Sequence, residues 1–266
     1  MKAVIAQWVR EDNIDHVNSI SAPVHPRNTF YTRVVKRSID IIFSLLAIAV
    51  TLPINLVIGA VTFFDVGKPI FFRQARAGMN GKLFNIVKFR NMRETVDENG
   101  VLLPPEKRVT KWGKFVRKTS LDELLNFYSV LRGDMSLIGP RPLPDTYLCR
   151  YSDRHKMRLS VRPGLECPPR HISGYDGTWQ QRFENDIWYA EHVSLWTDLL
   201  MVFKLIQYTV NKRFAKKRGA AKSSSFIGYN EEGIAIDLNE APLEYVVKVL
   251  EMNGIDTGEA KEAALK

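Results

Sequence analysis

Residues 39–64 read IDIIFSLLAIAVTLPINLVIGAVTFF, and these 26 residues contain a single charged side chain, that of Asp40. About 20 apolar residues are enough for a helix to span the hydrocarbon core of a bilayer. The stretch begins too late in the chain, and its apolar run is too long, for a cleaved signal peptide. It therefore predicts a membrane segment and excludes a purely soluble protein.

Basic residues flank this apolar stretch on both sides: Arg33, Lys36 and Arg37 before it, and Lys68, Arg73, Arg76 and Lys82 after it. A helix that crosses a membrane once keeps one flank poor in Lys and Arg, because orientation follows the positive-inside bias. A segment that turns back leaves both flanks on the cytoplasmic side. Pro53 lacks a backbone donor and crowds the carbonyl of Ala49, which favours a break there. We predict a re-entrant helix hairpin broken at Pro53; the alternative is a kinked spanning helix.

The composition of the whole chain narrows the function classes. Its 266 residues are 45% apolar and carry a formal net charge of +9, which attracts nucleic acid, phosphorylated substrates or acidic lipid headgroups. The two cysteines, Cys149 and Cys167, have no metal-ligand spacing. They exclude a disulfide framework and a zinc site, and they indicate a reducing compartment.

Composition shifts divide the chain into five predicted parts. A loosely ordered N-terminal arm (1–35) precedes the membrane hairpin (36–68), which is followed by a cytoplasmic domain (69–211). A basic and Ser-rich linker (212–230) then leads into an acidic C-terminal tail (231–266). Within the tail, Pro242–Met252 is predicted to form one short helix.

The cytoplasmic domain begins with a predicted β-hairpin. Two aromatic and β-branched runs flank Gly78–Gly81, and the Asn-Gly pair in that turn is a strong hairpin signal. Its exposed side is expected to carry Arg73, Arg76, Lys88 and Arg90. These side chains form either a solvated edge or a surface that binds phosphates.

The remainder of this domain is predicted to be helical, apart from a polar, turn-rich loop at 94–105 and an irregular segment at 163–178. Residues 107–118 combine basic side chains with Trp112 and Phe115, as in a helix on an anionic leaflet or a nucleic-acid stacking surface. The neighbouring membrane segment favours the leaflet. One amphipathic helix is expected at 143–160 and another at 179–208, the second being too polar to span and therefore interfacial or buried in the core.

The candidate chemistry lies in residues 119–142. Ser120 and Glu123 have the spacing of a capping box, followed by a predicted buried stripe of Leu124, Leu125, Tyr128 and Leu131. A helix start is a sufficient structural explanation for these carboxylates. The same helix dipole would lower the pKa of Asp122 and keep it ionised.

The same stretch also supplies the parts of a phosphate-chemistry site. A carboxylate can attack phosphorus to give an acyl phosphate. A neighbouring carboxylate can hold Mg²⁺ against substrate phosphates, and a guanidinium between prolines can bind phosphoryl oxygens in a fork. Asp122, Glu123 and Arg141 provide one residue for each role.

Seven motifs, taken together, resemble a known family. They are KRSID at 36–40, FFRQ at 71–74, KFRNM at 88–92, SLDEL at 120–124, LRGDMSLIGPRP at 131–142, VRPG at 161–164 and SLWTDL at 194–199. In this order and spacing they are similar to those of the small monotopic polyprenyl-phosphate phosphoglycosyltransferases, a bacterial sugar transferase family. The resemblance covers Lys36 to about Lys212.

The resemblance implies a phosphoglycosyltransferase. Such an enzyme moves a phospho-sugar from a nucleotide sugar, usually a UDP-sugar, to polyprenyl (undecaprenyl) phosphate, the first membrane step of capsule, exopolysaccharide or glycan synthesis. By the family's pattern, Asp122 is the nucleophile that forms a covalent aspartyl phospho-sugar intermediate, and Glu123 binds Mg²⁺. The cytoplasmic domain at 69–211 is then the catalytic domain.

The resemblance also assigns the surrounding residues. Arg141 is expected to bind phosphate and Arg90, with Lys88 beside it, to meet the lipid phosphate, while Asp186 and Asp198 match acidic positions that support the site. The loop at 164–170 departs from the family's pattern, and Arg170 or His171 is the candidate substitute for a missing arginine there.

The expected fold is mostly α with a small β-hairpin, in a monotopic membrane protein with a re-entrant, Pro-broken helix hairpin and interfacial amphipathic helices. Its expected location is the cytoplasmic face of the bacterial inner membrane, with phospholipids as partners, a homodimer as a further expectation, and no nucleic acid. The altered loop and the acidic tail keep a second reading open, a non-catalytic membrane scaffold of a glycan assembly complex.

Overall fold

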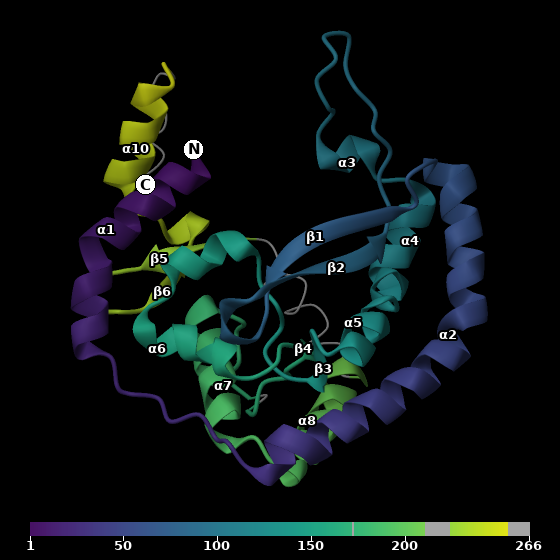
Figure 1. The fold of residues 1–266 in the computed structure, drawn as a ribbon. Coiled ribbons are helices and arrows are strands. Elements are labelled where there is room, and N and C mark those ends of the chain that lie inside the picture. The colour runs from purple at the N-terminus through teal and green to yellow at the C-terminus, as the bar shows by residue number, and fades with distance from the viewer. Residues whose placement is uncertain (172, 211–223, 255–266) are drawn as a thin grey trace.

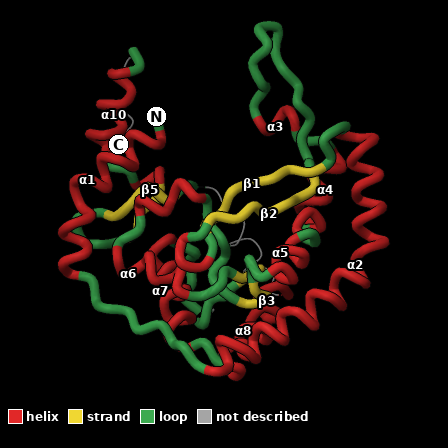
Figure 2. Tube along the Cα trace, viewed as in Figure 1, coloured by secondary structure: helices red, strands yellow, loops and turns green. Residues whose placement is uncertain are grey.

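The computed structural model describes residues 1–171, 173–210 and 224–254 (Figure 1). Over these ranges it is mostly helical with small two-stranded sheets, which confirms the predicted class (Figure 2). The α-helices are α1 (Lys2–Ile20), α2 (Lys36–Val66), α3 (Pro105–Arg108), α4 (Lys111–Thr119), α5 (Asn126–Arg132), α6 (Asp153–Lys156), α7 (Trp179–His192), α8 (Leu195–Val210) and α10 (Leu243–Met252). The strands are β1 (Phe71–Ala77), β2 (Leu83–Phe89), β3 (Ser136–Ile138), β4 (Gly164–Glu166), β5 (Phe226–Tyr229) and β6 (Ala235–Asp237).

The apolar stretch forms helix α2, which continues from a π-helical turn at Tyr31–Val35. Together they form a 36-residue helix with a mean hydropathy of 2.5 in its most apolar window, of which only 17% is buried. Pro53 lies inside the helix, and Figure 1 shows that α2 changes direction along its course around the body. The hydroxyl of Thr51, two residues before the proline, donates to the carbonyl of Ala47 at 2.7 Å. Length, composition and exposure indicate a membrane helix.

The predicted hairpin is confirmed. Strands β1 and β2 pair antiparallel from Phe71 opposite Phe89 to Ala77 opposite Leu83. Asn80 and Gly81 take positive φ values of 56° and 76° in the connecting turn, as the Asn-Gly signal predicts. The hairpin lies over the centre of the body in Figure 1, between α2 and the two chain ends.

Two glycines hold the Gly-Pro-Arg-Pro element in place. Strands β3 and β4 pair in parallel, Ser136 opposite Gly164 and Ile138 opposite Glu166. A Cβ at Gly139 would lie 2.6 Å from the carbonyl oxygen of Arg162, and a Cβ at Gly164 would overlap the backbone of Gly139. The two backbones approach this closely because neither residue has a side chain. The loop that carries Arg141 therefore starts from a fixed strand pair.

The predicted capping box at Ser120 is wrong. Ser120 has a φ of 57°, ends α4 in the left-handed conformation and makes no side-chain capping bond. The chain then forms a 3₁₀ turn at Leu121–Glu123, and α5 begins only at Asn126. The predicted stripe is wrong as well: Tyr128 is exposed, and α5 buries Asn126, Ser129 and Val130 instead.

The two chain ends pack on each other, which corrects the prediction of a loosely ordered arm. Residues 2–20 form α1, whose Ile5, Val9 and Val17 are buried, and α1 packs on β5 and α10. The predicted linker includes β5, and the predicted helix in the tail is α10. We call Lys2–Ile20 together with residues 224–252 the terminal subdomain. The basic residues 211–223 lie outside the described residues.

The other predicted helices are shorter than expected. Residues 143–160 form two 3₁₀ segments around the single turn of α6, and residues 179–208 divide into α7 and α8. One face of α8 is exposed, with Trp196 at 80% and Phe203 at 56%. An exposed apolar face of this kind fits an interfacial helix.

Candidate active site

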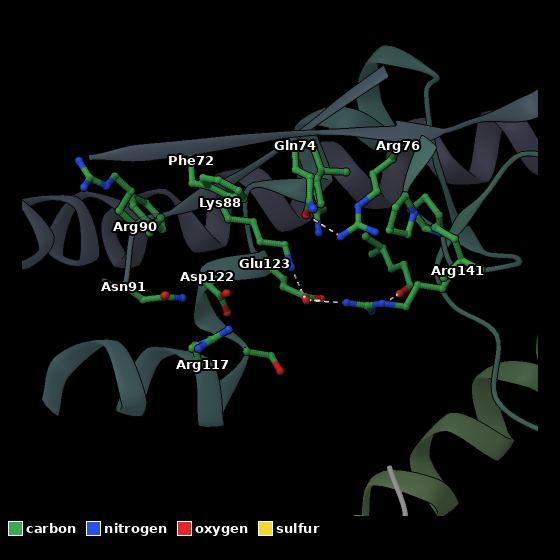
Figure 3. Close-up of a pocket in the computed structure, with 18 of the residues that line it drawn as sticks. Phe72, Gln74, Arg76, Lys88, Arg90, Asn91, Arg117, Asp122, Glu123 and Arg141 are labelled. Atoms are coloured by element: carbon green, nitrogen blue, oxygen red, sulfur yellow. Dashed lines mark hydrogen bonds and ion pairs between the residues drawn. The ribbon is translucent and has the colours of Figure 1, made fainter. Parts of the chain in front are cut away.

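A cavity of about 920 Å³ lies between the hairpin, the 3₁₀ turn at Leu121–Glu123 and the Gly-Pro-Arg-Pro loop (Figure 3). Three carboxylates line it, Glu94, Asp122 and Glu123. The cations that line it are Arg76, Lys88, Arg90, Arg108, Arg117, Arg141 and Arg182. This excess of positive charge suits an anionic ligand with more than one phosphate.

Glu123 is the electrostatic centre of the cavity. Its Oε1 accepts hydrogen bonds from Nζ of Lys88 at 2.8 Å and from Nη2 of Arg141 at 2.5 Å. Burial raises the pKa of Glu123, but the two cations outweigh it and lower that pKa to about 2. Glu123 is therefore ionised at any physiological pH, and it holds the two cations in place.

Asp122 lies beside Glu123 and is only 7% exposed. Burial raises the pKa of Asp122, Lys88 opposes that shift, and the neighbouring Glu123 adds to it. The expected lowering by a helix dipole is therefore wrong, because the residue lies in a 3₁₀ turn and not at the start of a capped helix. A carboxylate stripped of water is a stronger nucleophile, provided that a nearby cation keeps part of it ionised. Figure 3 shows Arg117 pointing toward Asp122.

Arg141 is held in place through both its guanidinium and its backbone carbonyl. Its Nη1 donates to the carbonyl of Leu165 at 3.1 Å, and its own carbonyl accepts from Nη2 of Arg158 at 2.9 Å. Arg158 is fully buried and makes a two-point ion pair with Asp186, with distances of 2.9 and 2.7 Å. Asp186 therefore acts on the site through Arg158 and does not line the cavity itself.

The structure brings most of the predicted site residues together. Asp122, Glu123, Arg141, Lys88 and Arg90 all line the cavity. In Figure 3 Arg90 and Arg141 lie at opposite ends, with the two carboxylates between them.

Besides Asp186, two predicted residues lie outside the cavity lining. Asp198 accepts hydrogen bonds from Tyr31, Lys36 and Tyr189, each at 2.6 Å, and so joins α8 to the start of the membrane helix. Arg170 is exposed, with its guanidinium over the ring of Trp188 at 5.4 Å. Neither lines the cavity among the described residues.

The sequence did not predict every residue of the cavity, and it placed Arg73 on the same face of the hairpin as Arg76. Phe72, Gln74 and Arg76 share the cavity face of β1, whereas Arg73 alternates to the other face. The two-residue period of a strand was the signal that separates Arg73 from Arg76. Arg158 and Arg182 carried no such signal, because only the packing of distant segments reveals their roles.

The carboxylates of the cavity fit a magnesium ion that is bound together with a substrate. Within the described ranges, no three His, Cys, Asp or Glu side chains gather to hold a metal. Mg²⁺ commonly uses one or two protein carboxylates and completes its octahedron with water and substrate phosphates. Asp122 and Glu123 are adjacent in the cavity and offer that number of carboxylates. When bound, the ion would supply positive charge to the phosphates.

The exposed apolar helix α2 and the cationic cavity with its adjacent carboxylates Asp122 and Glu123 fit a membrane-associated transferase, and the family comparison agrees. The profile of the family described as "Bacterial sugar transferase" matches residues 31–212. The chain belongs to this family.

Three relatives are similar to this chain. It is 39% identical over 180 residues to "Uncharacterized sugar transferase EpsL" of Bacillus subtilis (strain 168), which covers 67% of this chain and 87% of the relative. It is 36% identical to UDP-N-acetylgalactosamine-undecaprenyl-phosphate N-acetylgalactosaminephosphotransferase of Aeromonas hydrophila, over 65% of this chain and 43% of the relative. It is 37% identical to UDP-glucose:undecaprenyl-phosphate glucose-1-phosphate transferase of Klebsiella pneumoniae, over 69% of this chain and 41% of the relative. The chain thus spans less than half the length of the two relatives that are named by substrate.

Proposed function

We propose that this protein transfers a phospho-sugar from a nucleotide sugar, a UDP-sugar in the first instance, to polyprenyl phosphate. The observation that carries the proposal is the pair Asp122 and Glu123 in a cavity lined by seven cations. The substrates named for the relatives from Aeromonas hydrophila and Klebsiella pneumoniae support the same chemistry. Such a transfer begins the assembly of a lipid-linked glycan.

In the first half of the proposed reaction, a carboxylate oxygen of Asp122 attacks the phosphorus that bears the sugar. A phosphorus–oxygen bond forms to Asp122, and the bond to the nucleoside monophosphate breaks, so that group leaves with the electron pair. Phosphoryl transfer requires attacking and leaving oxygens in line, with charge on the oxygens between them. Arg141 and Lys88, both held by Glu123, are placed to neutralise that charge.

In the second half, a phosphate oxygen of the polyprenyl phosphate attacks the same phosphorus. The acyl-phosphate bond breaks, and the Asp122 carboxylate is regenerated together with a polyprenyl diphosphate sugar. Because this attack is also in line, the phosphate oxygen enters from the side opposite to Asp122, which the nucleoside monophosphate has left. Arg90 is proposed to bind the lipid phosphate, because it lies at one end of the cavity (Figure 3) and close to the end of the membrane helix. Its Nη1 donates to the carbonyl of Pro69, just beyond the end of the membrane helix, at 3.1 Å.

The proposed activity is tested by nucleotide release. Membranes or detergent-purified protein would be incubated with polyprenyl phosphate, Mg²⁺ and a panel of UDP-sugars, and UMP would be followed. We expect UMP release with one or two of the UDP-sugars. Release beyond a single turnover should require polyprenyl phosphate. No release with any donor would instead favour the non-catalytic scaffold.

We further propose that α2 enters and leaves the membrane on the cytoplasmic face of the inner membrane. Pro53, the bend of α2 and the basic residues on both flanks support this topology. In a protein in which Cys149 and Cys167 are replaced by serine, cysteines placed at Ser38 and at Lys68 are expected to react with an impermeant maleimide only in inside-out vesicles. Labelling of one position from each side would show a spanning helix and contradict the proposal.

The raised pKa of Asp122 predicts an acid limb in the pH profile. The nucleophile must be ionised, so the rate of the first half-reaction should fall with falling pH, at values above the ordinary 3.8 of an aspartate. Glu123 remains ionised down to about pH 2 and does not account for that limb. Lys88→Met removes a charge that favours ionised Asp122 and should move the limb to higher pH. Lys82→Met, an exposed lysine at the hairpin turn, is the matched control and should leave it unchanged.

A further inference from the structure

The terminal subdomain lies outside the family match, which covers residues 31–212, yet it reaches the reaction cavity. Ser224 and Ser225, the residues directly before β5, line the cavity together with Trp179 and Arg182 of α7. Both serines are partly exposed. In the wall that these four residues form, the two serines lie outside the region that matches the family profile, whereas Trp179 and Arg182 lie within it.

Packing fixes the position of the two serines. The ring of Phe226 contacts Phe183, Tyr147 and Trp179 with centroid distances of 4.9, 5.6 and 5.8 Å. The backbone amide of Phe226 donates to the hydroxyl of Tyr147 at 3.2 Å, and its carbonyl accepts from Nη1 of Arg150 at 2.6 Å. Phe226 therefore anchors the start of β5 against the body, and Ser225 is held one residue away.

This wall stands at the Arg141 end of the cavity. Residues Pro142, Leu143 and Pro144 follow Arg141 along the cavity lining and lead to Tyr147, whose ring contacts Trp179 at 5.7 Å. The guanidinium of Arg182, which also lines the cavity, lies over the ring of Trp179 at 5.0 Å. An aromatic ring, a guanidinium and two hydroxyl groups are suited to a base and a ribose.

In-line geometry determines which part of the nucleotide sugar lies at the Arg141 end of the cavity. The leaving group departs on the side of the phosphorus opposite to the attacking oxygen. Asp122 lies on one side of Glu123 and Arg141 on the other (Figure 3). The nucleoside monophosphate therefore leaves toward Arg141 and beyond it toward Arg182 and Ser225.

We infer that the terminal subdomain completes the nucleoside-binding end of the donor site, with Ser225 and Arg182 as specificity-determining residues. The inference rests on the proposed function for the identity of the donor. It gives the chain ends, which lie outside the family match, a role in substrate recognition together with Arg182 of the matched region.

The test measures binding as well as turnover. Ser225→Leu fills the wall with an apolar side chain and should weaken UMP binding to the full-length protein about tenfold, equivalent to about 1.4 kcal/mol. Binding of inorganic pyrophosphate, which lacks the nucleoside, should change by less than twofold. In turnover, KM for the UDP-sugar should rise similarly while KM for polyprenyl phosphate stays unchanged.

Ser19→Leu is the matched control, because Ser19 is an exposed residue of α1 in the same subdomain and does not line the cavity. It should leave UMP affinity unchanged. If Ser225→Leu lowers the melting temperature of the protein, Arg182→Gln provides the same test from α7.

Unchanged UMP affinity in both Ser225→Leu and Arg182→Gln would overturn the inference, as would equal weakening of UMP and pyrophosphate. Failure of the proposed function has a different signature, namely UMP binding by the wild type without UMP release from any donor.

Discussion

Asp122→Asn is expected to lower the rate of UMP release by at least about 10⁴-fold, because the amide cannot form the acyl-phosphate bond. The substitution keeps the shape of the side chain and removes a buried charge, so the protein should remain folded. UMP binding should persist, since Lys88, Arg141 and Glu123 are unaltered. Intact-mass measurement after mixing with donor alone should show a phospho-sugar adduct on the wild type and none on the variant.

Asp134→Asn is the matched control for that experiment. Asp134 forms a surface ion pair with Arg132 at 2.5 Å and does not line the cavity. It should retain wild-type UMP release and the adduct. An Asp122→Asn protein that still releases UMP at more than a hundredth of the wild-type rate would exclude Asp122 as the nucleophile.

The second large effect is expected from the buried ion pair. Asp186→Leu leaves the fully buried Arg158 without its counter-charge, which should lower the free energy of unfolding by about 3–5 kcal/mol. Denaturant titration in detergent, followed by tryptophan fluorescence, would measure it. Because Arg158 also binds the carbonyl of Arg141, activity should fall under conditions in which the variant is still folded.

Two further variants test the cause of that loss. Arg158→Met combined with Asp186→Leu removes both charges and should recover much of the lost stability. Asp134→Leu breaks an exposed pair and should cost no more than about 1 kcal/mol. If Asp186→Leu costs no more than Asp134→Leu, the ion pair does not support the Arg141 loop.

Local signals predicted the parts of the fold that depend on neighbours in the sequence. The Asn-Gly turn gave the hairpin, because two consecutive positive-φ residues almost require such residues. The apolar run predicted α2. The motifs placed Asp122, Glu123 and Arg141 in one predicted site, and all three line the same cavity.

Local patterns gave wrong predictions where long-range contacts compete with them. Ser120 and Glu123 have capping-box spacing, but the Glu123 carboxylate bonds to Lys88 and Arg141 and is not needed at a helix end. Helix α1 escaped prediction because Ile5 and Val9 find their apolar partners in Ile227 and Ile236, more than 200 residues along the chain. No window of the sequence contains both halves of that core.

The pairing of the two chain ends also bears on how the protein is made. Helix α1 is synthesised first, but β5, the strand it packs on, emerges only after residue 225. Contacts of such wide sequence separation form late, because the entropy cost of closing a long loop comes before the contacts can stabilise the fold. The membrane helix and hairpin can therefore assemble before the wall at Ser225, which cannot exist until residue 225 has been synthesised. A nascent chain that has not reached residue 225 lacks the wall to which we assign nucleoside binding.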